Sequence, residues 1–328
     1  MTQNRPTIGL ALSGGGVRGL AHLGVLKVFE EAHIPVDYLA GTSMGGIVSA
    51  VYAAGLPIDE AIAFAQRMGL TDIASPPDDW HGLFGHNKLA KLLGELLGSE
   101  ALTFEDLQIP LSVIATDIET GEMVVFNEGP LIPALLATSA FPIMFTPVRY
   151  QGRWFVDGGV LNNFPVDWVR RMGADRVVGV TTPPSVQLNM EDSADEAADE
   201  MEMEHSRLSL RALFSSFSLP ALEWHLPLLI AETATGYTVS LVSQQRLRLS
   251  PPDLLLEVHL PNMGTFATQR SAEAIAAGQQ ATREALPALR KLRDTPAPPG
   301  ALQAWRRWRR RLARAWAAFN APDYSCFP

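Results

Sequence analysis

The sequence predicts an α/β protein, a three-layer α/β/α domain built on a mainly parallel central sheet. Three observations predict this class. Short apolar runs alternate with helical patterns along most of the chain, glycine-rich turns follow several of the runs, and 328 residues at 47% hydrophobic supply a large core. A strand–helix rhythm of this kind is typical of parallel strands covered by helices on both faces.

The strands are expected where short apolar runs rich in β-branched residues end at glycine or polar residues. The first run ends at three glycines, and later ones end at GTSMGG and at DGG. The expected strands are residues 7–13, 36–40, 110–118, 122–127, 152–159, 175–182 and 253–261.

The helices are expected where apolar residues recur every three or four positions between these strands. The expected helices are residues 18–32, 47–54, 58–68, 88–97, 132–139, 165–173 and 268–292, with further helices after the acidic stretch at 191–204.

Composition shifts divide the chain into three parts. Residues 1–293 form the predicted domain, and the proline-rich DTPAPPG at 294–300 is predicted to be a linker that ends the last helix. Residues 301–328 form a basic tail, with six arginines and no acid between residues 301 and 320. The acidic stretch 191–204 is interpreted as a solvated loop or exposed helix.

The same composition excludes several classes of protein. The single cysteine, Cys326, allows no internal disulfide framework and no cysteine metal cluster. The apolar start of the chain is broken at once by glycines, unlike a signal peptide, and the apolar region 226–242 is too interrupted to span a membrane. We expect cytoplasmic residence, with no metal and no cofactor.

A GxGxxG pattern at Gly14, Gly16 and Gly19 raises the question of a dinucleotide site. Such a site needs an acidic residue at the end of the second strand, about 20 residues on. That strand ends at Ala40, and the nearby acid, Asp37, stands at its beginning. The pattern therefore favours another use of the glycines.

A second pattern, Gly41-Thr42-Ser43-Met44-Gly45-Gly46, lies between a predicted strand and a predicted helix. In that context GxSxG is typical of a nucleophile elbow, where a strained turn exposes the serine and glycines remove side chains that would clash. A glycine–serine loop without catalytic function is the alternative. The flanking strand and helix favour catalysis, with Gly41 and Gly45 as elbow glycines.

An activated serine also needs an oxyanion hole and a base. Gly14, Gly15 and Gly16 open a helix and offer backbone N–H groups suited to an alkoxide, and Arg18 adds positive charge. Asp157 follows a strand and precedes Gly158 and Gly159, so its carboxylate could reach the same edge of the sheet. On its own, Asp-Gly-Gly is better explained as a surface turn.

Taken together, these residues resemble the patatin-like phospholipase family, in particular bacterial members similar to the catalytic domain of neuropathy target esterase. The matching segments stand in the family's order over residues 7–183 and are GGGVRG at 14–19, GTSMGG at 41–46, SAFPIMFTPV at 139–148 and DGG with NNFPVD at 157–167. The resemblance implies a patatin-like serine hydrolase domain with Ser43 as nucleophile, Asp157 as general base and an oxyanion hole from the first glycine motif. It implies phospholipid or lysophospholipid substrates and leaves headgroup, chain length and position of attack open.

Two histidines and one different function remain to be weighed against the Ser43–Asp157 dyad. His259 follows Ser43 and Asp157 in the chain order of a Ser-Asp-His triad, but it stands in an apolar strand pattern, which favours a buried or edge histidine. His22 is interpreted as a packing residue in the first helix. The third alternative is a membrane-binding adaptor on an inactive hydrolase fold, against which the intact motifs weigh.

The basic tail has the pattern of an interfacial helix. At 100° per residue its large apolar side chains gather on one face and most of its arginines lie around the rest. The predicted membrane-binding residues are Trp305, Trp308, Leu312, Trp316, Phe319, Arg306 and Arg310. An anionic membrane surface, here the inner face of the cell membrane, is one partner; docking on the acidic body is the other. No fold supports nucleic-acid binding.

Deleting residues 301–328 should lower binding to vesicles that contain anionic lipid, because several aromatic side chains and six arginines are removed together. Vesicle co-sedimentation of the full and shortened chains measures this. Equal binding by both would contradict a membrane-binding role for the tail.

Overall fold

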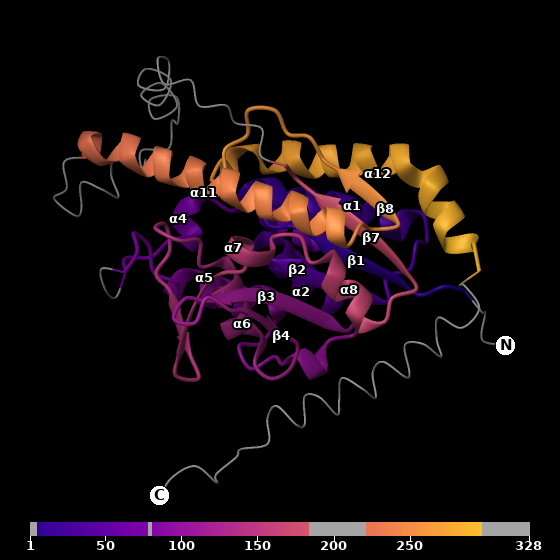
Figure 1. Ribbon diagram of the computed structural model, residues 1–328, viewed down its shortest axis with the longest axis horizontal. Helices are drawn as coiled ribbons and strands as arrows, with labels where there is room; N and C mark the ends of the chain where they lie inside the picture. The colour runs from indigo at the N-terminus through magenta and orange to yellow at the C-terminus, as the bar shows by residue number, and fades with distance from the viewer. Residues whose placement is uncertain (1–4, 78–80, 184–220, 297–328) are drawn as a thin grey trace, which may run out of the picture.

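A computed structural model describes residues 5–77, 81–183 and 221–296. One eight-stranded sheet lies between layers of helices, with the C-terminal ends of the parallel strands at one edge (Figure 1). The strands are β1 (Ile8–Leu12), β2 (Tyr38–Thr42), β3 (Leu111–Asp117), β4 (Met123–Phe126), β5 (Val148–Tyr150), β6 (Arg153–Asp157), β7 (Arg176–Thr181) and β8 (Leu254–Glu257).

The sheet has a parallel part and an antiparallel end. The strand order is β5-β6-β3-β2-β1-β7-β8, with β4 paired to β3. From β3 to β8 all neighbours are parallel, whereas β4, β5 and β6 pair antiparallel. The predicted fold class is therefore confirmed.

The helices cover both faces of this sheet. The α-helices are α1 (Ala21–Glu31), α2 (Met44–Ala53), α3 (Ile58–Arg67), α4 (Leu70–Ile73), α5 (Asn87–Leu97), α6 (Leu131–Ser139), α7 (Gly159–Asn162), α8 (Val166–Met172), α11 (Ala221–Leu249) and α12 (Ser271–Asp294), and short 3-10 turns occupy Gly16–Leu20, Phe104–Asp106 and Thr268–Arg270.

Side chains alternate between the two faces of the sheet because successive strand residues point in opposite directions. Ile8 and Leu10 of β1 lie in the larger core with residues of α1, α2 and α12, whereas Ala11 packs with Val169 of α8 on the opposite face. All five β1 residues are buried, which explains why the sequence shows a continuous apolar run.

The differences from the predicted elements are local. The strand β5 was not predicted, and the helix predicted over 18–32 begins as a 3-10 turn at Gly16–Leu20. The strand predicted over 253–261 is shorter, because β8 ends at Glu257; His259 lies two residues beyond this edge strand and is exposed, so of the two expected positions, buried or at the edge, the buried one is wrong. The acidic stretch 191–204 and the tail 301–328 lie outside the described residues.

The helix α11 covers the apolar region that the sequence excluded as a membrane span. Among the described residues, no helix combines the length and the apolar content needed to cross a bilayer. In α11 the apolar residues are interrupted by serines, threonines and glutamines.

The helices α1 and α12 pack backbone to backbone through a pair of glycines. A Cβ on Gly24 would collide with the carbonyl oxygen of Ile275, and a Cβ on Gly278 with that of Ala21. Both are buried. Because backbone atoms cannot move aside as a flexible side chain can, this contact admits glycine only.

Gly24→Ala should therefore destabilise the fold, although alanine is the better helix former by about 1 kcal/mol. The collision pushes α12 away from α1, and such overpacking costs about 1–3 kcal/mol or more. Thermal unfolding measures the change. Gly236→Ala in α11, where no atom lies within 4 Å of the added Cβ, is the matched control and should raise the melting temperature. A rise in both variants would contradict the close contact.

Candidate active site

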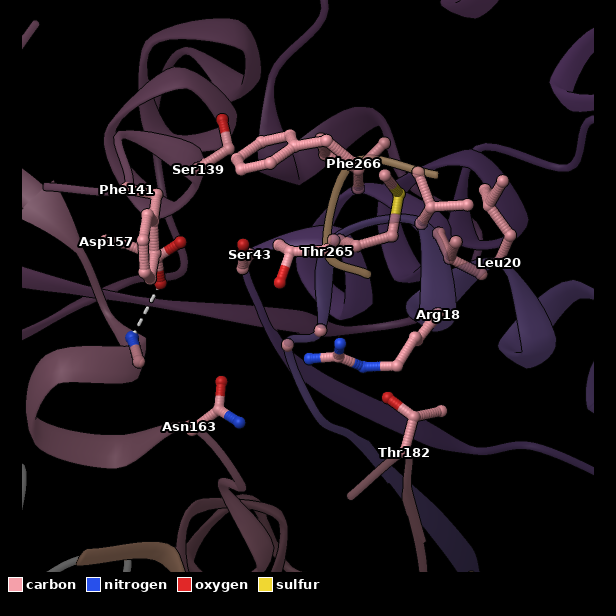
Figure 2. Close-up of a pocket in the computed structure, with 18 of the residues that line it drawn as sticks. Arg18, Leu20, Ser43, Ser139, Phe141, Asp157, Asn163, Thr182, Thr265 and Phe266 are labelled. Carbon is pink, nitrogen blue, oxygen red and sulfur yellow. Dashed lines mark hydrogen bonds between the residues drawn. The ribbon is translucent and has the colours of Figure 1, made fainter. Parts of the chain in front are cut away.

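A pocket of about 400 Å³ opens at the C-terminal edge of the parallel strands. In open α/β sheets this edge is where ligands bind, because the loops that follow the strands gather there. Ser43, Asp157 and the glycines Gly14, Gly15 and Gly16 all line it. Figure 2 shows Ser43 and Asp157 at the same opening, with Asn163 and Thr265 beside it.

Ser43 occupies a sharp turn between β2 and α2. Its backbone angles are φ 53° and ψ −128°, a conformation that costs energy for a residue with a side chain. A Cβ on Gly41 would collide with the backbone of Gly45, and a Cβ on Gly45 with the carbonyl oxygen of Leu12. The turn therefore closes only with these glycines, and it has the geometry of the predicted elbow.

Thr138 of α6 holds this turn in place. Its hydroxyl accepts a hydrogen bond from the Ser43 N–H (2.8 Å) and donates one to the carbonyl oxygen of Ile114 in β3. The side chain is fully buried. Sequence reasoning assigned Thr138 only to a helix, since nothing local marks it as a partner of a residue 95 positions earlier.

Asp157 lies at the end of β6 with only 2% of its surface exposed. Burial raises the pKa of its carboxyl to about 6, because desolvation of the charged form outweighs the hydrogen bonds from the Ser43 side chain and from the Gly159 N–H. The Gly159 N–H donates to Oδ1 at 2.7 Å, the dashed line in Figure 2. A carboxylate with a raised pKa is a stronger base than one in water.

The register of β3 brings the serine and the aspartate together. Thr42, which precedes Ser43, pairs with Ile114, and Asp157 pairs with the next residue, Ala115. The strands β2 and β6, more than 100 residues apart in the chain, thus both end beside the same two neighbouring residues of β3. A Cβ on Gly158 would collide with the carbonyl oxygen of Ile114, so the turn after Asp157 also packs closely on β3.

The glycine loop after β1 has two different kinds of N–H group. The Gly14 N–H donates to the carbonyl oxygen of Asn163 at 3.2 Å, and the Val17 N–H donates to that of Thr265 at 2.9 Å. For Gly15 and Gly16, which both line the pocket, the described part of the chain supplies no such acceptor. Of the three predicted glycines, Gly14 fixes the loop, whereas Gly15 and Gly16 line the pocket and their N–H groups have no backbone acceptor among the described residues.

Arg18 lies beside this loop with 8% of its surface exposed. Its Nη1 donates to the carbonyl oxygen of Met263 at 2.9 Å. This bond connects the glycine loop to the segment before α12, and Gly16, at φ +58°, packs against Thr265 of the same segment. Arg18 therefore has a structural contact in addition to the positive charge for which the sequence singled it out.

The pocket extends from Ser43 into an apolar arm between helices of one layer. Its walls come from α2, α3 and α5, among them Ile47, Val51, Phe64, Leu89, Leu93 and Leu96. Its other walls are more polar and come from the ends of β7 and β8 and from α11. The arrangement fits a molecule with one long apolar part and one polar part.

The two histidines weighed in the sequence do not join the site. His259 is not among the residues that line the pocket. His22 is fully buried in α1, donates a hydrogen bond from Nε2–H to the carbonyl oxygen of Ser13 (2.7 Å), and has its pKa lowered to about 4 by burial. Its interpretation as a packing residue is supported.

Two further features concern cofactors. Asp37 forms an ion pair with Arg5 and accepts a hydrogen bond from the Ile8 N–H. It therefore lies at the opposite edge of the sheet from Gly14, where it cannot serve a dinucleotide bound at the glycine loop. Among the described residues, no three His, Cys, Asp or Glu side chains are grouped so as to hold a metal ion.

The part of the chain that contains this site is similar to known proteins. The family model described as patatin-like phospholipase matches residues 10–169. An uncharacterised NTE family protein of Mycobacterium tuberculosis is 33% identical over 179 residues, which cover 54% of this chain and 49% of that protein. Patatin-like phospholipase domain-containing protein 6 of Homo sapiens is 34% identical over 184 residues, 53% of this chain and 13% of that protein.

The aligned segment thus spans about half the length of the mycobacterial relative and a smaller share of the human one. Among solved structures, VipD from Legionella pneumophila aligns with 87% of this chain and 67% of its own, at 14% identity and a TM-score of 0.47. Residues 10–169, which contain Ser43, Asp157 and the glycine loop, match the family model described as patatin-like phospholipase.

Proposed function

We propose that this protein is a serine acyl hydrolase that cleaves fatty-acyl esters of membrane lipids through a Ser43–Asp157 dyad. The family supports a lipid hydrolase in general terms. The observation that carries the finer proposal is a serine in a strained strand–helix turn, beside a buried aspartate with a pKa raised to about 6, at the mouth of an apolar pocket.

In the first step Asp157 takes the proton of the Ser43 hydroxyl while Oγ attacks the ester carbonyl carbon. The carbonyl oxygen becomes an oxyanion, for which the N–H groups of Gly15 and Gly16 are the donors. Ser43 is also the N-cap of α2, and the partial positive charge of a helix N-terminus favours a developing anion. Collapse of the tetrahedral intermediate expels the alcohol, which takes the proton from Asp157, and leaves an acyl-Ser43 ester.

In the second step water attacks the acyl-enzyme. Asp157 accepts a proton from the water, the same N–H groups stabilise the second oxyanion, and the fatty acid leaves as Ser43 recovers its proton. A carboxyl with a pKa near 6 accepts the proton of serine or water more readily than one at 3.8, and it can still give that proton back. No side chain beyond the dyad is needed to move a proton.

The apolar arm supports a fatty-acyl chain as the part of the substrate that binds deepest. Methylene groups gain roughly 0.8 kcal/mol each when they leave water for such walls. The polar side of the pocket is then left for the alcohol part of a phospholipid or lysophospholipid. With the acyl chain and the alcohol part so placed, the ester carbonyl lies between them, beside Ser43, which lines the same pocket.

Ser43→Ala should abolish release of fatty acid from phosphatidylcholine and lysophosphatidylcholine vesicles, because the nucleophile is removed. Ser139→Ala is the matched control: Ser139 also lines the pocket, but its hydroxyl donates to the helix carbonyl of Leu135. It should keep activity within a few-fold and still react with a fluorophosphonate. Equal rates for the Ser43 variant and the wild type would contradict the proposal.

Asp157→Asn should be inactive and yet more stable at pH 8. Since the folded pKa is raised from 3.8 to about 6, ionising the buried carboxyl opposes folding above pH 6, by on the order of 1–3 kcal/mol. The neutral amide avoids this cost. Activity assays and thermal unfolding at pH 8 measure the two effects. An active variant would exclude Asp157 as the base.

A further inference from the structure

The helix α11 lies along the outside of the domain, over the polar side of the pocket (Figure 1). It runs for 29 residues, and none of its residues whose burial is described is fully buried. Its inner face lines the pocket with Gly236, Val239, Ser240, Ser243, Gln244 and Leu247. A surface helix of this length usually buries a stripe of apolar residues against the core, whereas the described residues of α11 are at most partly buried.

Several large apolar side chains of α11 face solvent instead. Ile230, Tyr237 and Leu241 are 43%, 56% and 57% exposed. At about 100° per residue, positions separated by seven and eleven residues fall within about 40° of one another, so the three form one ridge. We call this ridge, with Arg248 on the same side, the outer face of α11.

The charge on this part of the helix is positive. Between residues 233 and 250 the sequence contains no aspartate or glutamate, although the chain as a whole has a net charge of −9. Arg246 points inward, where it donates to the carbonyl oxygen of Leu161 and pairs with Asp167 at 3.6 Å. Arg248 is exposed. An apolar ridge that has an exposed arginine and no acidic residue beside it suits a surface that contains anionic lipid.

The outer face is continuous with the pocket rim. Gln244 is exposed and also lines the pocket. Tyr237 and Leu241 each follow a pocket-lining residue, Gly236 and Ser240, by one position. A bilayer in contact with the outer face would therefore lie next to the opening that leads to Ser43.

A second exposed apolar residue lies in a loop whose neighbouring residues line the pocket. Ile143 is 42% exposed and has φ +74°, an uncommon and costly conformation for a β-branched residue. It lies between Phe141 and Phe145, which both line the pocket. Strain that holds an apolar side chain in solvent beside a binding site is a pointer to function.

We infer that the outer face of α11 and the Ile143 loop form a docking surface for a bilayer that contains anionic lipid. The inference is separate from the predicted tail helix, and it rests on the proposed function only in taking lipid as the occupant. Docking places the rim of the pocket at the membrane, so that an acyl chain reaches the apolar arm without crossing water. Association of two copies through this face is an outcome that the test distinguishes.

A fluorescent label tests contact directly. Because Cys326 is the only cysteine, Cys326→Ser with Tyr237→Cys allows an environment-sensitive nitrobenzoxadiazole label at position 237. Vesicles of phosphatidylcholine with 30% phosphatidylglycerol should shift its emission to the blue and raise its intensity about twofold or more. The control label, in Cys326→Ser with Ile118→Cys, replaces a residue that is equally exposed, at 55%, and does not line the pocket. It should not change.

Three results would overturn the inference: no shift at position 237 on vesicles that sediment the protein, an equal shift at both positions, or a shift that follows protein concentration without vesicles, as dimerisation would give. The readout does not need catalysis. If the wild type hydrolyses no ester and resists fluorophosphonate but the label still shifts, the proposed function fails while the docking surface stands.

Two variants connect docking with turnover. Tyr237→Gln with Leu241→Gln should lower hydrolysis of dilute vesicles about tenfold and leave hydrolysis of water-soluble p-nitrophenyl butyrate within twofold. Ile143→Gly should bind vesicles less tightly and yet keep or raise the melting temperature, because glycine adopts φ +74° without strain. Equal loss on both substrates, or unchanged vesicle binding by both variants, would contradict the docking role.

Discussion

The site depends on one strand, β3, and on the register with which two distant segments pair to it. Thr42 pairs with Ile114 and Asp157 pairs with Ala115. Thr138 adds a bond between Ile114 and the Ser43 backbone. Because a one-residue slip in a strand reverses the direction of every side chain, this register fixes which side chains meet at the edge of the sheet.

Burial of Asp157 has a cost for folding and a use in the proposed chemistry. A carboxylate in water has a pKa of 3.8 and would hardly accept a proton from serine. Burial raises the pKa to about 6, and the ionised form then opposes folding at neutral pH. The large core on β1, β2 and α1 offsets such costs. The strained backbone of Ser43 is tolerated for the same reason: packing far from the site stabilises the fold enough to offset the strain.

Most of the fold was predictable because local pattern and final structure agree. The runs that became β1, β3 and β7 are continuous and apolar since these strands are buried on both faces. β5 has three residues and pairs only with β6, so nothing in its own sequence marks it. The sequence singled out Ser43 by the GxSxG pattern between a predicted strand and a predicted helix, and Asp157 only through the resemblance to the patatin-like family.

The remaining features of the site depend on contacts between distant segments. The bond from Thr138 to Ser43, the use of the Gly14 N–H by Asn163 and the bond from Arg18 to Met263 each join parts of the chain that no periodicity connects. The outer face of α11 could not be predicted from the sequence either. Its sequence mixes apolar and polar residues around the helix, and only burial separates the pocket side from the exposed side.

The central claim is that the buried carboxyl of Asp157 activates Ser43, and the pH dependence of fluorophosphonate labelling tests it most directly. With a base of pKa about 6, the labelling rate should be constant from pH 8 to 7 and fall about tenfold per unit below pH 6 as the carboxyl is protonated. In Asp157→Asn the rate should be low and lack this inflection. An unchanged inflection in that variant, or a wild-type rate that is flat down to pH 4.5, would contradict the account.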